Sequence, residues 1–398
     1  MVVEIGLVGA PSSGKSTFFK AITLKDVKIA SYPFTTIEPN EGAAFVTSKC
    51  PHVELGIKCN PRNAPCMDGT RFIPIKVWDV AGLVKGAHEG RGHGNSFLDD
   101  VMKSRGLIHI LDISGRTNSD GEPTSNFDPS ETVKMLDEEI DYWMLGILKR
   151  ELQLLKNTKV DYDKIIYSME KRFSGIGVSR ENIEVALQKS TLKVDVPISL
   201  WQDYDIIDFV SILRKLSKPT IIAANKIDVE GAEDNLKKLK KRFPNYTIIP
   251  CSAEIELALR EAASNNLIKY IPGSPDFEIL SKNLNEKQKN ALKFIKDFLE
   301  KWKTTGVQNI LNTLVFEKLK MKVIYPVEDE IHFSDKKGNV LPDAFLLEEK
   351  GTALDLAYKV HEDIGKNFIA AIDARTKKRI AADHILKNND IISIKARK

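Results

Sequence analysis

The sequence predicts an α/β fold with a doubly wound, mostly parallel sheet, a helical insertion and a small C-terminal unit of strands and helices. Apolar runs at Ile5–Val8 and Pro219–Ala224 end in glycine-rich or polar loops, as buried parallel strands do. Residues 128–200 have helical periodicity instead. From Leu319 onward, short strand patterns surround a helix.

The first strand leads into a phosphate-binding loop. Residues 9–16 read GAPSSGKS and fit the pattern G-x-x-x-x-G-K-S/T, and residues 17–22 then continue as a helix. Backbone N–H groups of such a loop surround a phosphate. We therefore expect nucleotide contacts from Gly9, Ala10, Pro11, Ser12, Ser13, Gly14, Lys15, Ser16 and Thr17. Lys15 would reach the β- and γ-phosphate oxygens, and the Ser16 hydroxyl would bind Mg²⁺.

Two further segments are candidates for the γ-phosphate end of the site. Residues 75–82 (IKVWDVAG) read as a strand that ends in D-x-x-G, which places Asp79 beside Mg²⁺ and the Gly82 N–H toward the γ-phosphate. Residues 32–36 (YPFTT) offer hydroxyls for the remaining Mg²⁺ position, and Thr36 is favoured over Thr35. Lys15 and Gly82 are the predicted catalytic groups, because they face the phosphoryl group that is transferred.

A third group of residues is typical of guanine recognition. Asn225, Lys226 and Asp228 form an N-K-x-D motif after a strand. The Asp228 carboxylate can accept hydrogen bonds from N1–H and from the exocyclic amine of guanine, whereas adenine lacks that amine. Lys226 would lie along the base, and the backbone of Ser252 and Ala253 would face the guanine carbonyl. The expected ligands are therefore GTP and GDP.

Three of the four cysteines gather in one segment rich in proline and asparagine. The candidate metal ligands are Cys50, His52, Cys59 and Cys66. They could hold a structural Zn²⁺, two thiols could form a disulfide in an oxidising or hyperthermophilic setting, or all could be free loop thiols. The spacing is not that of a standard zinc finger, and the sequence leaves the three possibilities open.

The helical insertion is predicted from an excess of chain. About 140 residues separate Gly82 from Asn225, and the excess falls on residues 128–200. A long helix is expected after Asp128-Pro129, and another one is expected to start at Val178–Asn182. Apolar residues of the first helix follow helical spacing at Val133, Leu136, Ile140, Trp143, Ile147, Leu148, Leu152 and Leu155. Two or three helices would form an antiparallel coiled projection, either for a partner or as a packing subdomain.

The C-terminal part reads as a ubiquitin-like β-grasp. Strands at Val323–Phe333 and Asn339–Leu341 would form a hairpin around a turn at residues 335–338. A helix would begin at Gly351 and end near Gly365, and strands would follow at 368–374 and 391–396. A lysine-rich helical segment at 284–316 would connect this unit to the rest.

These motifs together resemble the Obg-like GTPases, specifically the YchF branch of the TRAFAC class of P-loop GTPases. The resemblance spans nearly the whole chain and is carried by residues 32–42 (YPFTTIEPNEG), 79–98 (DVAGLVKGAHEGRGHGNSFL) and 351–361 (GTALDLAYKVH), the last of which resembles the TGS signature. It implies a Ras-like G domain, a helical insertion, a C-terminal TGS domain and action on ribosomes or RNA. The local charges of the TGS domain are nearly balanced, so a plain protein-docking role stays open.

The chain departs from the family pattern at three positions, and a further position, Leu83, bears on turnover. Many YchF members have an altered fourth motif and prefer ATP, but Asp228 completes the guanine signature here. Relatives with asparagine at the position of Ser12 can recruit a potassium ion, which serine does not favour. Leu83 stands where many GTPases have a water-orienting glutamine, which predicts slow intrinsic hydrolysis. His93 replaces the usual leucine, and a solvated loop histidine is favoured over a catalytic one.

Composition sets the broad class and the domain count. The chain has 398 residues and a formal net charge of +4, so nucleic-acid contacts would have to come from local patches. Without a credible secretory signal or an apolar run of membrane-spanning length, we expect a cytoplasmic protein with no membrane partner; its oligomeric state is open. The predicted domains are a G domain at 1–127 and 201–282 with a cysteine-containing insertion at about 48–70, a helical insertion at 128–200, a helical linker at 283–318 and a TGS domain at 319–398.

The expected function is a Mg²⁺-dependent GTPase switch whose GTP and GDP forms differ at residues 32–42 and 82–96. It would turn over slowly and act on ribosomes or RNA. Two alternatives stay open. One is an RNA-binding or ribosome-binding scaffold that nucleotide stabilises and in which hydrolysis is incidental, and the other is an ATPase of the YchF type.

Overall fold

The computed structural model describes residues 2–23, 40–80, 86, 101, 103–155, 162–193 and 196–397. The chain divides into two compact units. The P-loop unit comprises Glu4–Phe19 and Val77–Glu254, and the C-terminal unit comprises Met1–Val3, Lys20–Lys76 and Ile255–Lys398. Each unit is described by itself.

The P-loop unit is built on a parallel sheet, as predicted. Its strands are β1 (Glu4–Val8), β5 (Gly106–Asp112), β6 (Thr220–Asn225) and β7 (Thr247–Pro250), which neighbour one another in this order. Every neighbouring pair among them is parallel. The end of β4 (Thr70–Asp79) follows on the other side of β1, where the Val80 N–H donates to the Leu7 carbonyl at 3.2 Å. All residues of β5 are buried, which explains why these strands read as continuous apolar runs.

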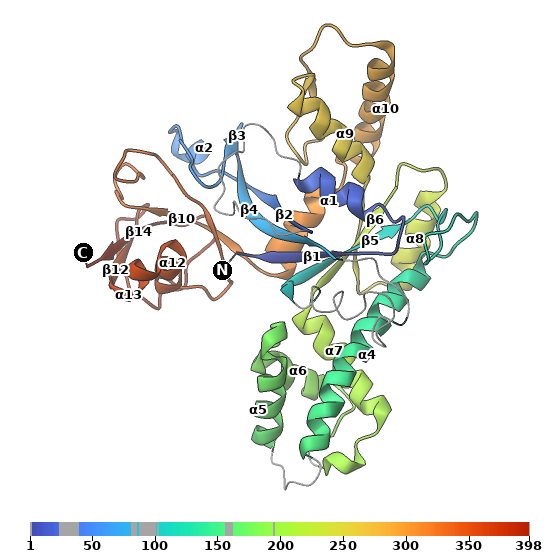
Figure 1. The fold of residues 1–398 in the computed structure, drawn as a ribbon. Coiled ribbons are helices and arrows are strands. Elements are labelled where there is room, and N and C mark those ends of the chain that lie inside the picture. The colour runs from blue at the N-terminus through green and yellow to red at the C-terminus, as the bar shows by residue number, and fades with distance from the viewer. Residues whose placement is uncertain are drawn as a thin grey trace. The chain divides into compact units, whose positions relative to one another are not determined.

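The helices of the P-loop unit fall into two groups. The helices α1 (Lys15–Thr23) and α8 (Ala232–Arg242) follow β1 and β6. The others, α4 (Ser130–Leu155), α5 (Tyr162–Phe173), α6 (Arg180–Lys189) and α7 (Asp203–Ser217), form a separate helical region that Figure 1 shows beside the sheet. Helices α4 and α6 both pack on α7, and α5 contacts α4 and α6.

The long helix and the second helix predicted for the insertion are confirmed. Buried side chains of α4 recur at helical spacing, and they share one core with Phe173 of α5 and Phe209 of α7. These α4 residues are Leu136, Ile140, Met144, Leu148 and Leu152. The Ser179 side chain caps α6 by accepting a hydrogen bond from the Asn182 N–H. Burial of one apolar face therefore determines where these helices form.

A buried ion cluster fixes α7 against α4. Arg214 on α7 is 3% exposed and pairs with Asp137 at 2.9 Å and with Asp141 at 2.6 Å. A buried guanidinium without a carboxylate partner would be strongly destabilising. The cluster therefore specifies how these two helices face each other.

The C-terminal unit contains the end of the chain and two segments from its first quarter. The early strands are β2 (Glu41–Lys49), β3 (Cys66–Met67) and most of β4, with the short helix α2 (His52–Leu55) between β2 and β3. Strand β2 neighbours β4, and β3 pairs with β4 in antiparallel fashion. The remaining elements before residue 320 are α9 (Ala253–Ser264), β8 (Ile268–Lys269), β9 (Glu278–Ile279), α10 (Glu286–Trp302), α11 (Val307–Asn312) and a π-helix at Thr313–Lys318.

A second sheet lies in the part of the chain that is predicted to be a TGS domain. Its strands β10 (Lys322–Val327), β11 (Phe345–Leu347), β12 (Phe368–Asp373), β13 (Arg379–Ile380) and β14 (Ile391–Ala396) lie in the order β11-β10-β14-β12-β13. Leu356 of helix α12 (Ala353–Val360) packs on Ile324, Ala371 and Ile392 of this sheet. Helix α13 (Glu362–Lys366) follows. A helix on one face of a mixed sheet agrees with the predicted β-grasp.

The predicted hairpin is wrong in its partner strand. Strand β10 ends at Val327 and pairs with Phe345–Leu347, not with residues 339–341. Between them, the Asp329 carboxylate accepts from the N–H groups of residues 331 and 332, and the Asp335 carboxylate accepts from those of residues 337 and 339. The predicted turn at residues 335–338 is present, with the Leu341 N–H donating to the Phe333 carbonyl at 2.8 Å, but the pairing around it is limited to a single bridge at Ser334 and does not extend into β10.

The single helix predicted from Gly351 to Gly365 is also divided. His361 is extended, with φ −163° and ψ 144°, so α12 ends before it and α13 begins after it. The His361 ring nitrogen Nδ1 accepts from the Asp363 N–H at 3.1 Å, which makes His361 the cap of the second helix. The domain boundaries proposed from the sequence stay predictions.

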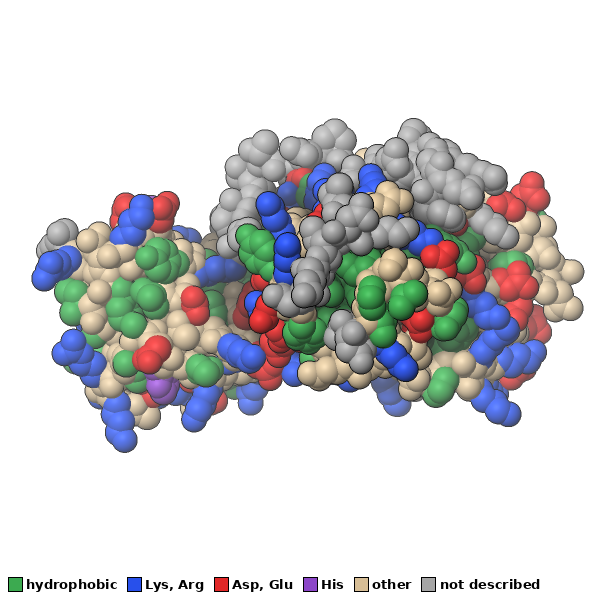
Figure 2. Space-filling model, turned by 90° about the horizontal axis from the view of Figure 1, so that it is seen from below, with side chains coloured by type: hydrophobic (Ala, Val, Ile, Leu, Met, Phe, Trp, Pro, Cys, Tyr) green, Lys and Arg blue, Asp and Glu red, His purple; other side chains and the backbone are tan. Residues whose placement is uncertain are grey.

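Two properties of the surface follow from the composition. Figure 2 shows basic and acidic side chains interspersed over the face that it draws, which agrees with the small net charge of +4. Among the helices that the structure describes, none is long and apolar enough to span a membrane.

Candidate nucleotide-binding site

The carboxyl ends of four parallel strands bring the predicted motifs to one edge of the sheet. The P-loop follows β1, Asp112 ends β5, Asn225 ends β6, and Cys251 follows β7. Asp112 lies opposite Asn225 in the register of β5 and β6. Ligands of open α/β sheets bind at this edge, so the strand order itself assembles the site.

The P-loop depends on glycine at two places where the chain approaches other atoms closely. Gly14 has φ 89°, and a Cβ there would lie 2.3 Å from Nδ2 of Asn225. A Cβ at Gly9 would lie 2.5 Å from the carbonyl oxygen of Ile110. Both distances are shorter than any tolerable contact, so the two glycines of the motif are required by packing as well as by phosphate access.

Asn225 joins the P-loop to the loop after β7. Its Nδ2 donates to the Ser13 carbonyl at 2.9 Å, and its Oδ1 accepts from the Ala253 N–H at 2.9 Å. The side chain is thus occupied within the protein, and so is the Ala253 N–H that the sequence predicts at the base carbonyl. In this structure Asn225 holds two loops of the site together.

Lys226 is held by a residue that sequence reasoning missed. Its Nζ donates to the Ser12 carbonyl at 2.8 Å and to Asp112 Oδ2 at 2.8 Å. Asp112 also accepts from the hydroxyls of Ser114 at 2.5 Å and Thr117 at 2.7 Å. Asp112 could have been predicted from the sequence, because it is a polar residue at the end of a buried strand, as Asn225 is.

The same contacts keep the Asp112 carboxyl ionised. Burial alone would raise the pKa of this carboxyl, but the hydrogen bonds from Lys226, Ser114 and Thr117 outweigh burial and hold its pKa below the usual value. Asp112 is therefore a stable anion that positions the Lys226 ammonium.

Two buried oxygens of the site have no hydrogen-bond partner among the described residues. They are Oδ1 of Asp228 and Oγ of Ser13. A carboxylate oxygen accepts hydrogen bonds and cannot donate them when ionised. Because a buried acceptor without a donor is costly, Asp228 fits a ligand that brings N–H groups to this position.

The phosphate end of the site is present in part. The Lys15 ammonium pairs with the Asp79 carboxylate, and both side chains are largely shielded, with 13% and 19% exposure. The hydroxyl-bearing Ser16 is exposed at the start of α1. Thr35, Thr36, Gly82, Leu83 and His93 lie outside the described residues, as do most positions of the segments 32–42 and 82–96.

One contact links the segment after Asp79 to the helical region. The Gly86 N–H donates to Oε1 of Glu139 at 2.6 Å, and Glu139 is 4% exposed on α4. No sequence pattern pairs these two positions, because the contact is tertiary and its residues are 53 positions apart.

Three segments of the chain match models of known protein families. Residues 4–155 match a family model described as "50S ribosome-binding GTPase", residues 223–329 match "Obg-like GTPase YGR210-like, G4 motif-containing domain", and residues 332–396 match the TGS domain.

Individual relatives cover nearly the whole chain. An uncharacterized GTP-binding protein of Methanocaldococcus jannaschii is 50% identical over 391 residues, which is 98% of each chain. An uncharacterized GTP-binding protein of Schizosaccharomyces pombe is 33% identical over 88% of each chain. The crystal structure of a GTP-binding protein from Pyrococcus horikoshii superposes with a TM-score of 0.76 at 36% identity, covering 99% of this chain and 100% of that one. The chain thus belongs to the Obg-like family of GTP-binding P-loop proteins, as a YGR210-like, YchF-related member with a C-terminal TGS domain.

Proposed function

We propose that the protein binds GTP and GDP through Asp228, hydrolyses GTP to GDP and phosphate with Mg²⁺, and acts as a slow switch on ribosomes or RNA. The observation that carries the choice of nucleotide is the buried Oδ1 of Asp228, which has no partner among the described residues. Guanine brings two donors to a carboxylate, whereas adenine presents an acceptor at N1. A GTP-bound state therefore satisfies Asp228, and an ATP-bound state leaves it unpaired.

Base selectivity tests this assignment directly. Asp228→Asn replaces one acceptor by an amide donor, which suits the 2-oxo group of xanthine. We expect the variant to lose GTP affinity by about 10-fold or more and to gain affinity for XTP, because an unpaired buried group costs about 1–3 kcal/mol. Titration of the parent chain and the variant with fluorescent GTP, ATP and XTP measures the change. Equal affinity of the parent chain for ATP and GTP would favour the ATPase alternative instead.

The side chains at the phosphate end suit Mg²⁺. The Asp79 carboxylate and the Ser16 hydroxyl offer the hard oxygen ligands that this ion prefers, and Thr36 is the proposed third ligand. When bound, Mg²⁺ neutralises charge on the β- and γ-phosphate oxygens. Lys15 would exchange its ion pair with Asp79 for the phosphates, and the Gly82 N–H would bind the γ-phosphate. Nucleotide binding thus separates a pair that already has the two required charges.

Turnover depends on groups in the second switch. Leu83 has no hydrogen-bonding atom in its side chain, so we expect the isolated chain to hydrolyse GTP at about 10⁻⁴ to 10⁻² s⁻¹, the range of unassisted GTPases. Either His93 or a ribosomal partner would then orient the water. His93→Leu separates these sources in single-turnover assays. If His93 orients the water, the basal rate falls by about 10-fold or more; if the partner does, only the ribosome-stimulated rate responds to switch mutations.

The switch and the scaffold alternatives differ in how binding to ribosomes or RNA depends on the bound nucleotide. A switch binds ribosomes or RNA differently in its GTP and GDP states, whereas a scaffold binds in both. Co-sedimentation with ribosomes at several salt concentrations, with GDP and with a non-hydrolysable GTP analogue, distinguishes them. Fast turnover that is independent of ribosomes and survives His93→Leu would contradict the proposed slow switch.

A further inference from the structure

Four side chains with soft ligand atoms meet in the C-terminal unit. Cys50 follows β2, His52 begins α2, Cys59 lies in the next loop, and Cys66 belongs to β3. Their ligand atoms all lie within 4.8 Å of one another. Cys50 is buried and the other three are partly exposed, so the cluster lies at the edge of the core.

Two distances from His52 to cysteines of the cluster are close to those of a tetrahedral metal site. Nδ1 of His52 lies 3.3 Å from Sγ of Cys59 and 3.7 Å from Sγ of Cys66. Zinc with Zn–S bonds of about 2.3 Å and a Zn–N bond of about 2.0 Å places neighbouring ligand atoms about 3.5–3.8 Å apart. All three cysteines of the cluster are free thiols. One ion therefore fits all four ligands at once, whereas a disulfide would use two and leave two.

Tight turns of the backbone create this convergence. Gly56, with φ 65°, ends α2 and redirects the chain toward Cys59. Asp68 and Gly69, with φ 45° and 82°, form the two-residue turn between β3 and β4. The Gly69 carbonyl then accepts from the Cys50 N–H at 2.8 Å. Segments 16 residues apart in sequence, at Cys50 and Cys66, are thus held side by side by backbone hydrogen bonds.

The buried guanidinium of Arg71 lies beside the cluster, and a negative charge there would stabilise it. Arg71 lies opposite Cys66 in the β3–β4 pair and has no solvent exposure. Its Nη2 donates to the carbonyls of Leu341 and Pro342, while its Nε and Nη1 have no hydrogen-bond partner among the described residues. Carbonyl oxygens are neutral and do not compensate a buried guanidinium. Three thiolates, a neutral imidazole and Zn²⁺ sum to one negative charge, which balances Arg71.

We propose that Cys50, His52, Cys59 and Cys66 hold one structural Zn²⁺ ion, which fixes the loop at residues 57–65 against residues 339–344 of the TGS domain. Four protein ligands complete a tetrahedral shell and leave no position for a substrate, so the site is structural. Its soft Cys₃His ligand set favours Zn²⁺ over Mg²⁺ or Ca²⁺.

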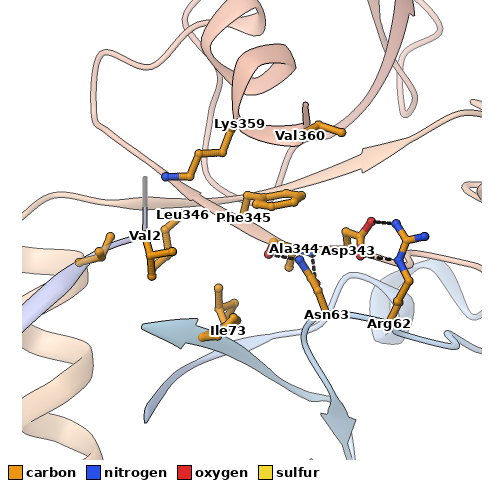
Figure 3. A pocket seen from close by; sticks show the side chains of 12 residues that line it. Val2, Arg62, Asn63, Ile73, Asp343, Ala344, Phe345, Leu346, Lys359 and Val360 are labelled. Atoms are coloured by element: carbon orange, nitrogen blue, oxygen red, sulfur yellow. Dashed lines mark hydrogen bonds and ion pairs between the residues drawn. The ribbon is translucent and has the colours of Figure 1, made fainter. Parts of the chain in front are cut away.

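The loop between Cys59 and Cys66 makes the contacts that this ion would stabilise (Figure 3). This loop contains no helix or strand, but its backbone forms hydrogen bonds with the backbone of residues 339–344 of the TGS domain. Its N–H groups at Asn60 and Arg62 donate to the carbonyls of Val340 at 3.1 Å and Pro342 at 2.6 Å. Figure 3 shows Arg62 beside Asp343, with which it forms a bidentate ion pair, and Asn63 beside Ala344, with which it exchanges two hydrogen bonds.

Metal content of the full-length chain tests the proposal. Purified chain from a zinc-supplemented culture should contain one zinc per chain by elemental analysis. Replacement by Co²⁺ should give the thiolate charge-transfer band and the visible d–d bands of tetrahedral cobalt. Cys59→Ser and His52→Ala should lower zinc affinity by more than about 100-fold in competition with a chelator, because loss of an outer hydrogen-bonding partner alone costs 10–100-fold. Cys251→Ala, which changes the cysteine outside the cluster, should keep the full zinc content.

The consequence for the loop has its own readout. Chelation of zinc should raise hydrogen exchange at residues 57–65 and 339–344 by 10-fold or more, and leave exchange of β5 unchanged. Two results would overturn the proposal. The first is a zinc-free chain whose intact mass shows the loss of two hydrogens, which means a disulfide; the second is a zinc-free chain with three titratable thiols in the cluster after incubation with excess Zn²⁺. The cobalt spectrum of the unmodified chain keeps the test valid even if the variants do not fold.

Discussion

At the scale of single residues, Asn225 and Asp228 divide the work that one motif is expected to do. Asn225 uses both ends of its amide to connect Ser13 with Ala253. Asp228 keeps a buried oxygen without a partner among the described residues. The first residue therefore connects two loops of the site, and in the proposed function the second reads the base, although the two are three positions apart in the chain.

The ion pair of Lys15 and Asp79 leads to a prediction on metal dependence. Asp79→Ala and Ser16→Ala should each lower affinity for GTP more than affinity for GDP, because these two residues would hold the Mg²⁺ that neutralises the additional charge of the γ-phosphate. Isothermal titration with both nucleotides, with Mg²⁺ and with EDTA, measures the difference. Asn290→Ala, an exposed change on α10, is the matched control. Equal losses for GDP and GTP would contradict the metal assignment.

Residue-level prediction from sequence is possible where a motif specifies chemistry by itself. The P-loop glycines, Lys226 and Asp228 were predicted as nucleotide contacts from spacing alone, and this role stays a prediction. Asp112 and the pair of Gly86 with Glu139 were missed, since their roles depend on which strands and helices become neighbours. The distances among Cys50, His52, Cys59 and Cys66 could not be read from spacing either, because irregular loops separate them.

At the scale of elements, β5 carries a buried histidine that we expect to make stability depend on pH. His109 lies between Val8 of β1 and Ile222 of β6. Burial lowers the pKa of His109 to about 4, whereas an unfolded histidine titrates near 6.5. Between these values the unfolded chain binds more protons than the folded chain, so the free energy of unfolding falls as pH falls through this window.

His109→Leu should remove that pH dependence. At pH 5 the linkage amounts to about 2 kcal/mol relative to pH 7.5 for the parent chain. Urea unfolding of both proteins, followed by tryptophan fluorescence at the two pH values, compares the slopes. His384→Ala, which changes an exposed histidine, should keep the slope of the parent chain. A slope unchanged by His109→Leu would mean that His109 is not neutral in the folded state.

The elements also show where periodicity fails as a guide. It predicted α4 and the parallel strands, which are long and buried. It failed between β10 and β11, where Asp329 and Asp335 turn the chain through side-chain hydrogen bonds that no apolar pattern reveals. It also missed the break at His361, because the cap that starts α13 depends on the conformation of one residue.

At the scale of the whole molecule, an early loop and the TGS domain form one unit although they are some 280 residues apart. Asn63 bonds to both the N–H and the carbonyl of Ala344, at 2.9 Å and 3.2 Å. Asn63→Ala leaves two backbone groups unpaired, at a cost of about 1–3 kcal/mol. Hydrogen exchange at Ala344 should accelerate by about 5-fold to 100-fold in this variant, and Asn290→Ala should not change it. Equal protection in both variants would show that Asn63 contributes nothing to this contact.

The link between Gly86 and Glu139 has a mechanical consequence. Helix α4 has 26 residues, which makes it a rod about 39 Å long at a rise of about 1.5 Å per residue. Glu139 lies in its first half, closer to the sheet end than to the far end. A rod held near one end acts as a lever, so a rotation of about 5° at Glu139 would move Leu152, about 20 Å farther along the helix, by about 2 Å. A small movement at Gly86 would therefore become a larger movement of any partner that is bound at the far end of α4.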